Sequence, residues 1–180
     1  MPTILIPYRG DAKRRLRPAI RAAVAVAMLG DVVSAALEVG KILVVTDDPG
    51  VVPRGVEVVP DPAKGLGAAV AAGLSRVEGH ALVLNADLPC ATPAAIARLA
   101  AAGLALVEAA DGTTNALSLP DPSGFSPLYG PGSAARFRAH APFSTLASPE
   151  LESDVDAEED LERYAALLGA RTRSLLAAAA

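Results

Sequence analysis

The chain has 180 residues, a formal net charge of −4 and a hydrophobic content of 52%, which fit one globular domain and exclude a disordered chain. Aromatic residues make up only 3% and tryptophan is absent, which disfavours base stacking as a binding mode. The single cysteine, Cys90, excludes an internal disulfide framework and a cysteine-rich zinc site. We interpret Cys90 as a small apolar side chain.

The first apolar run, residues 1–7, has no cationic region before it and is too short for a signal peptide or a membrane span. We therefore expect a cytoplasmic protein with no membrane partner. Charge is unevenly spread: six cations lie between residues 9 and 21 against one acid, whereas eight acids lie between residues 150 and 162. This asymmetry suits a site that binds a polyanion with metal ions, and it argues against a nucleic-acid surface.

Residues 3–7 are predicted to form the first buried strand, and the loop over residues 8–18 carries Gly10 and most of the early cations. Such a loop can surround a triphosphate with backbone N–H groups and positive charge. It is not a P-loop, because the Gly-Lys-Ser/Thr ending is missing, and it is not a Gly-x-Gly-x-x-Gly fingerprint. A solvated basic loop is the alternative.

The pattern next predicts a buried helix and two strands, over residues 20–39, 42–46 and 56–59. Thr46 begins a polar segment at the carboxyl end of its strand, which a plain turn would also explain. Gly65 and Gly67 lie at the start of a helix over residues 68–76. Glycines there let the backbone approach a ligand, and the helix N-terminus favours negative charge.

Asp87 follows a short run of Ala, Leu and Val that is typical of a buried strand and ends at about residue 85, and Pro89 prevents that strand from continuing. In open α/β sheets, ligands bind at the carboxyl ends of the strands. A carboxylate at this edge suits a hydrated Mg²⁺ that in turn binds a phosphate. Asp87 could instead cap the following helix, although Thr92 supplies a better N-cap.

The second half of the chain is predicted to contain a helix over residues 93–102, a strand over residues 104–108, a turn that enters another strand within residues 111–119, and a helix over residues 134–140. Thr113, Thr114 and Asn115 follow a glycine and could form either an oxyanion cradle or a turn, and the turn is favoured in isolation. Gly130 and Ser133 precede the last of these helices, where a second phosphate-binding helix start is possible.

The late acids Asp154 and Asp156 alternate along an extended segment, so both should point to one side. We predict a helix over residues 157–168 with Asp156 as its N-cap and Glu159 as the capping-box partner. These acids could be a capped helix start and nothing more. Residues 170–180 are alanine-rich and are predicted to be a frayed tail of a single domain over residues 1–180.

Five pieces occur in one order: Ile-Pro-Tyr-Arg with Lys-Arg-Arg-Leu near the start, then Asn-Ala-Asp-Leu-Pro, Gly-Thr-Thr-Asn-Ala-Leu, Phe-Ser-Pro-Leu-Tyr-Gly-Pro-Gly-Ser and Ser-Asp-Val-Asp-Ala-Glu-Glu-Asp-Leu. Together they resemble the guanylyltransferases of coenzyme F-420 biosynthesis, relatives of the molybdenum cofactor guanylyltransferases. The resemblance runs from residue 4 to about residue 168. It implies an α/β, single-domain, Rossmann-like nucleotidyltransferase fold, with a mostly parallel central sheet and helices on both faces.

The resemblance also implies the reaction. The phosphate of a three-carbon acid attacks the α-phosphorus of GTP, pyrophosphate leaves, and Mg²⁺ is the cofactor. The implied roles are Asp87 as principal metal ligand and catalytic residue, with Asp154 and Asp156 as further metal contacts. Lys13, a second catalytic residue, neutralises phosphate charge. The remaining implied contacts are Arg9, Lys13, Thr46, Gly65 and Gly67 for the nucleotide and Thr114, Gly130 and Ser133 for the acceptor.

This chain departs from the family at Asn85, where proline is frequent, and at Arg9, where lysine is frequent. The loop between residues 114 and 130 could carry an extra residue, which would exchange the roles of Thr113 and Thr114. Phosphoenolpyruvate is the expected acceptor, by association with an Ala- and Arg-rich composition. The alternatives are 2-phospho-L-lactate, 3-phosphoglycerate, another nucleotidyltransferase reaction, or a non-catalytic nucleotide-binding domain. A homodimer and hand-over of a labile product to the next pathway enzyme are further expectations.

Overall fold

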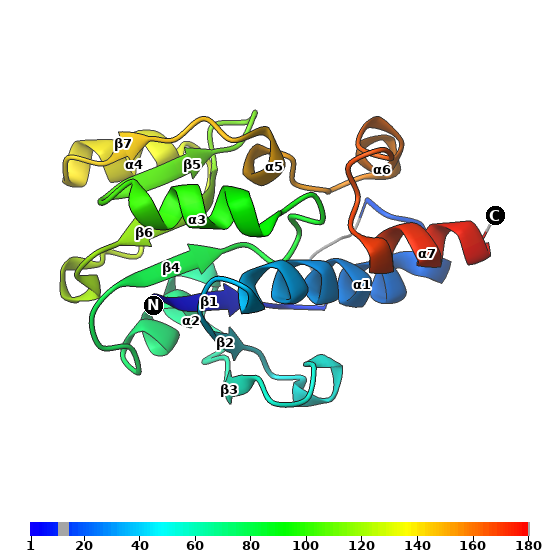
Figure 1. Cartoon of the computed structure of the whole chain (residues 1–180), viewed down its shortest axis with the longest axis horizontal. Helices are drawn as coiled ribbons and strands as arrows, with labels where there is room; N and C mark the ends of the chain where they lie inside the picture. Colours follow the sequence, from blue (N-terminus) through cyan, green and yellow to red (C-terminus); the bar gives the residue numbers. More distant parts are fainter. Residues whose placement is uncertain (11–14, 180) are drawn as a thin grey trace.

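The computed structural model describes residues 1–10 and 15–179. Seven strands form one sheet in the order β3-β2-β1-β4-β6-β5-β7 (Figure 1). The strands are β1 (Thr3–Pro7), β2 (Lys41–Val45), β3 (Glu57–Val59), β4 (Ala81–Leu84), β5 (Ala105–Glu108), β6 (Thr114–Leu119) and β7 (Ser144–Thr145). Of these strands, only β6 runs antiparallel to its neighbours, so the predicted mostly parallel sheet is confirmed.

Helices cover both faces of the sheet. They are α1 (Pro18–Leu37), α2 (Leu66–Leu74), α3 (Pro93–Ala101), α4 (Ser133–His140), α5 (Pro149–Glu152), α6 (Glu158–Arg163) and α7 (Ala170–Ala179). Successive β1 side chains point to opposite faces: Ile4 and Ile6 pack with Leu29 of α1, and Leu5 packs with Val70 of α2. The apolar strand β1 is therefore buried on both sides.

Helix α1 has 20 residues and a mean hydropathy of 1.8, so its length and composition alone would allow it to cross a membrane. Ten of its residues, however, are buried inside the protein. They pack against the sheet, α3 and α7, which accounts for the apolar composition of a core helix.

The alanine-rich tail corrects one prediction. Residues 170–179 form α7, a helix packed along α1, rather than a frayed end (Figure 1). The buried carboxylate of Asp31 on α1 accepts hydrogen bonds from the backbone N–H groups of Arg171 (2.9 Å) and Thr172 (3.0 Å). Asp31, which lies on another helix, thus provides the acceptors for N–H groups in the first turn of α7. Local composition could not show this contact.

The acidic segment corrects another prediction. Helix α6 spans only Glu158–Arg163, and its N-cap is Ala157, not Asp156. The Asp160 carboxylate, rather than that of Glu159, accepts hydrogen bonds from the backbone N–H groups of Asp156 (3.0 Å) and Ala157 (2.9 Å). The side chain of Asp156 instead pairs with Arg15, with 3.2 Å between Nη2 and Oδ2.

We expect Asp160→Ala to lower the free energy of unfolding by about 1 kcal/mol, because it removes the carboxylate that satisfies the start of α6. Asp156→Ala should change it by at most about 1 kcal/mol, since an exposed ion pair contributes little. Chemical denaturation of both variants measures the difference. A larger loss in Asp156→Ala than in Asp160→Ala would contradict this assignment of the cap.

Candidate active site

The topology brings separate segments to one edge of the sheet. The carboxyl ends of β1, β2 and β4 lie there, and so does the amino end of β6, because β6 is antiparallel. The backbone N–H of Asn85 donates to the carbonyl of Asn115 at 3.0 Å, which joins the end of β4 to the start of β6. The chain also reverses its direction of strand addition between β1 and β4, the position where open α/β sheets bind ligands.

Two predicted metal ligands meet at this edge. The backbone N–H of Val155 donates to the carbonyl of Asp87 at 3.0 Å, so the acidic segment lies against the end of β4. Burial raises the pKa of the Asp154 carboxyl above its usual value, and the nearby charges of Asp87 and Asp156 raise it further. A buried carboxylate beside two others is an arrangement that a cation stabilises.

No group of three or more His, Cys, Asp or Glu side chains within residues 1–10 and 15–179 is placed to hold a metal ion by itself. Mg²⁺ does not require such a group, because it commonly binds one or two carboxylates and completes its shell with waters and substrate phosphates. Asp87 and Asp154 fit that pattern. Asp156 is turned toward Arg15, which makes it the weaker of the two late candidates.

We expect Asp154→Asn to be more stable than the wild type at neutral pH without metal, while turnover falls. The folded-state pKa of Asp154 is raised above the ordinary 3.8, so between these two values the folded state binds more protons than the unfolded state. Wild-type stability therefore decreases as the pH rises through this window, and the variant lacks that loss.

Thermal unfolding in a chelating buffer, from below pH 3.8 to pH 7, measures this effect. Asparagine can still accept the hydrogen bond from Asn115 Nδ2, which is 3.2 Å from Asp154 Oδ1 in the wild type. A variant less stable than the wild type at pH 7 would contradict the electrostatic argument.

A pocket of about 180 Å³ lies at the carboxyl ends of β1 and β4. Its polar lining comes from Tyr8, Arg9, Asn85 and Asp87, and its apolar lining comes from α1 and α2. Arg9 lies 3.8 Å from the carboxylate of Asp61, measured from Nε to Oδ2. Burial and the charge of Asp48 raise the pKa of the Tyr8 hydroxyl, so this phenol stays protonated at neutral pH.

The other predicted nucleotide contacts have separate surroundings. The hydroxyl of Thr46 accepts a hydrogen bond from the backbone N–H of Asp48 at 3.1 Å, as in the plain turn that was the alternative for this segment. Gly65 has a φ of +92° with open space around it, a conformation that favours glycine. A Cβ on Gly67 would lie 2.7 Å from that of Pro127, so this glycine permits close packing. Lys13 lies outside the described residues.

Gly65 and Gly67 line a second pocket, of about 550 Å³, together with Gly130. The N-terminus of α2 therefore faces the loop that precedes α4. Arg136 holds this loop by donating to the backbone carbonyls of Leu128 and Pro131. The predicted nucleotide and acceptor glycines thus share one cleft.

Thr114 and Ser133 lie together, with 3.0 Å between their hydroxyl oxygens. Both side chains are buried, so this pair lies beneath the surface of the edge and is not an exposed cradle. The hydroxyl of Thr113 donates to Asp111 at 2.6 Å in an exposed turn. Of the two threonines, Thr114 is therefore the one beside Ser133.

Two asparagines at this edge have no assigned role in the sequence-based site, although Asn115 belongs to the possible oxyanion cradle that follows Gly112. Asn115 Nδ2 donates to the carbonyls of Leu151 (3.1 Å) and Glu152 (3.2 Å) and to Asp154, which anchors the acidic segment to β6. Asn85 lines the pocket beside Asp87. The signal that could have found them is their position, since Asn85 directly follows the buried strand β4 and Asn115 is a polar residue near the start of β6.

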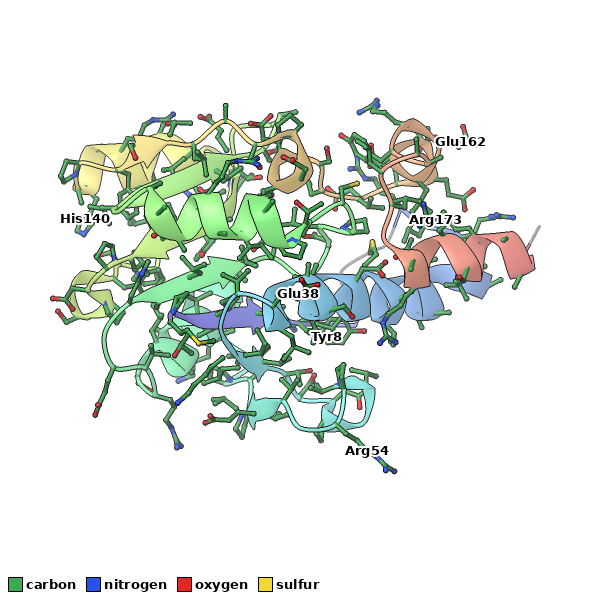
Figure 2. All side chains as sticks on the ribbon, in the orientation of Figure 1. Tyr8, Glu38, Arg54, His140, Glu162 and Arg173 are labelled. Atoms are coloured by element: carbon green, nitrogen blue, oxygen red, sulfur yellow. The ribbon has the colours of Figure 1, made fainter. Side chains whose placement is uncertain are left out.

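His140, an exposed residue at the last position of α4, lies away from this site. Figure 2 shows it far from Tyr8, at the end of α4. Its Nε2 is 2.9 Å from the hydroxyl of Ser126, an exposed local contact.

Comparison with known proteins supports the class that this geometry indicates. Residues 13–147 match the model of the MobA-like NTP transferase domain. The fold is similar to that of a putative nucleotide-diphospho-sugar transferase from Desulfovibrio desulfuricans G20, with a TM-score of 0.70, 15% identity and coverage of 98% of this chain and 95% of that chain. A nucleotidyl transferase from Methanothermobacter thermautotroptrophicus is also similar, with a TM-score of 0.66, 17% identity and coverage of 91% of this chain and 95% of that chain. The chain is a nucleotidyltransferase.

Sequence relatives define the family more narrowly. The phosphoenolpyruvate guanylyltransferase of Geodermatophilus obscurus is 40% identical over 169 residues, covering 86% of this chain and 79% of the relative. The phosphoenolpyruvate guanylyltransferase of Thermomonospora curvata is 36% identical over 202 residues, covering 97% of this chain and 88% of the relative. The 2-phospho-L-lactate guanylyltransferase of Natrialba magadii is 32% identical over 191 residues, covering 88% and 80%. The chain belongs to this family of guanylyltransferases, which confirms the resemblance.

Proposed function

We propose that the protein transfers GMP from GTP to the phosphate of phosphoenolpyruvate, as a cytoplasmic, Mg²⁺-dependent step of coenzyme F-420 biosynthesis. The observation that carries this proposal is the placement of Asp87 and Asp154 at one sheet edge with the buried Thr114–Ser133 pair. This edge offers carboxylates for a metal and neutral hydroxyls for an acceptor. The names of the relatives from Geodermatophilus and Thermomonospora support the choice of acceptor.

The chemistry needs positioning and charge neutralisation rather than a base. An oxygen of the acceptor phosphate is already ionised, and it forms a bond to the α-phosphorus of GTP. The bond from that phosphorus to the bridging oxygen breaks, and pyrophosphate leaves with the electron pair. Mg²⁺, held by Asp87 and Asp154, would supply charge neutralisation at the phosphates. Arg9 would add positive charge, as would Lys13 from outside the described residues.

A second candidate acceptor is 2-phospho-L-lactate, which the Natrialba relative favours. Both acids carry a phosphate and a carboxylate on three carbons. The pair Thr114 and Ser133 would recognise them by donor placement rather than by charge. Hand-over of a labile diphosphate product to the next enzyme is consistent with either acceptor.

Pyrophosphate release tests the proposal directly. The protein is incubated with GTP and Mg²⁺ and with phosphoenolpyruvate, 2-phospho-L-lactate, 3-phosphoglycerate or no acceptor, and ATP replaces GTP in a control series. We expect release that depends on both GTP and phosphoenolpyruvate. Faster release with 2-phospho-L-lactate would replace the proposed acceptor, and no release with any acid would overturn acid guanylylation.

A further inference from the structure

Asn85 ends the central strand in a position that the proposed reaction does not use. It lies two residues before Asp87 and lines the pocket at the ends of β1 and β4. Its backbone is fixed by the bond from its N–H to the Asn115 carbonyl. Its side-chain amide therefore has a definite place between the nucleotide pocket and the amino end of β6.

The orientation of this amide follows from its neighbour. Asn85 Nδ2 lies 3.2 Å from the backbone carbonyl of Thr114. A carbonyl can only accept a hydrogen bond, so the NH₂ side of the amide must face Thr114. The opposite atom, Oδ1, is buried and has no hydrogen-bond partner among the described residues.

An acceptor that is buried without a donor costs free energy, and native proteins seldom keep one without a reason. Most groups of the proposed substrates cannot satisfy it. The triphosphate of GTP and the phosphate and carboxylate of the acceptor are acceptors themselves at neutral pH. The nucleoside is different, because its ribose hydroxyls and the N1–H and 2-amino groups of guanine are donors.

We propose that Asn85 Oδ1 accepts a hydrogen bond from the nucleoside part of GTP, so that Asn85 contributes to recognition of the nucleotide. This inference rests on the proposed function for the identity of the nucleotide. It makes Asn85 a binding residue that also contacts Thr114, beside the acceptor pair. The nucleoside and acceptor sides of the site are then joined by one amide.

Calorimetric binding in the presence of Mg²⁺ and without acceptor tests this role. The probes are GTP and inorganic tripolyphosphate, which lacks the nucleoside, and the proteins are the wild type, Asn85→Ala and Asn85→Ser. Serine keeps a small polar group at the site if alanine prevents folding. We expect each variant to bind GTP about tenfold more weakly and tripolyphosphate as the wild type does.

Analogues then identify the donor. Two results together would identify a ribose hydroxyl as the donor. The corresponding deoxy analogue, 2′-deoxy-GTP or 3′-deoxy-GTP, binds the wild type more weakly than GTP does, and it binds Asn85→Ala with the same affinity as GTP. The same pattern with ITP identifies the 2-amino group, and no effect of these three analogues leaves the guanine N1–H. Ser118→Ala is the matched control, because Ser118 is a buried residue of β6 that contacts His80 instead.

Two results would overturn the inference while leaving the proposed function in place. One is unchanged GTP affinity in both Asn85 variants. The other is an equal loss for GTP and tripolyphosphate, which would place Asn85 at the phosphates or at their metal. Failure of the wild type to bind GTP at all would overturn the proposed function together with the inference.

Discussion

Asp87→Asn is expected to reduce turnover by about 10²–10³-fold or more while the fold stays intact. Asparagine has the same size as aspartate but lacks the negative charge that binds Mg²⁺. Asp87 lies at the end of β4 near Asp154, so its loss leaves one carboxylate where the proposed mechanism needs two. The fold should survive because the hydrogen bond from the Val155 N–H is accepted by the Asp87 backbone carbonyl, which the substitution keeps.

Steady-state pyrophosphate release, measured over a range of Mg²⁺ concentrations, tests this prediction, and circular dichroism checks the fold. Asp121→Asn is a matched control, because Asp121 is an exposed aspartate whose Oδ1 accepts a hydrogen bond from the Ser123 N–H, which asparagine can also do. We expect that control to turn over normally. Near-normal activity of Asp87→Asn at saturating Mg²⁺ would remove Asp87 from the metal site.

Ser133→Ala is expected to raise the KM for the three-carbon acceptor and to leave the KM for GTP nearly unchanged. Ser133 is fully buried and shares a hydrogen bond with Thr114, so its removal takes away one hydroxyl and also frees the other. Loss of one hydrogen bond to a charged group should lower kcat/KM by about ten- to a hundredfold.

The kinetics are measured with phosphoenolpyruvate and with 2-phospho-L-lactate, varying GTP and acceptor separately. Thr114→Ala should behave like Ser133→Ala. Thr113→Ala is the control, because its hydroxyl contacts Asp111 in an exposed turn. If the KM for GTP rises instead, Ser133 belongs to the nucleotide side, and the division of the cleft into nucleotide and acceptor sides is wrong.

The sequence predicted most of the fold because the central strands β1, β2 and β4 are short apolar runs. Such runs indicate strands that are buried on both faces, and the alternation of helices and strands indicates a largely parallel sheet. Asp87 could be placed at the binding edge for the same reason, since a proline two residues later ends its strand. The membership of the guanylyltransferase family was also predictable, because its motifs are continuous stretches of sequence.

The predictions that were wrong concern contacts between distant segments. Residues 170–179 carry weak signals of their own, yet they form α7 because Asp31, about 140 positions earlier, accepts hydrogen bonds from their backbone. The cap of α6 was misassigned because three neighbouring acids, Asp156, Glu159 and Asp160, could each accept its hydrogen bonds. Only geometry shows that Asp160 reaches the free N–H groups while Asp156 meets Arg15.

The residue types at the ends of the strands are readable from the sequence, because hydrophobic runs and chain-breaking prolines are local. How these ends meet depends on tertiary contacts. The antiparallel direction of β6 places Thr114 beside the end of β4, and the bond between Val155 and Asp87 brings the acidic segment to the same edge. The orientation of the Asn85 amide depends on the Thr114 carbonyl, 29 positions later, which no local pattern encodes. Pairing across a sheet depends on strand order and direction, so the composition of the site was readable in advance and its arrangement was not.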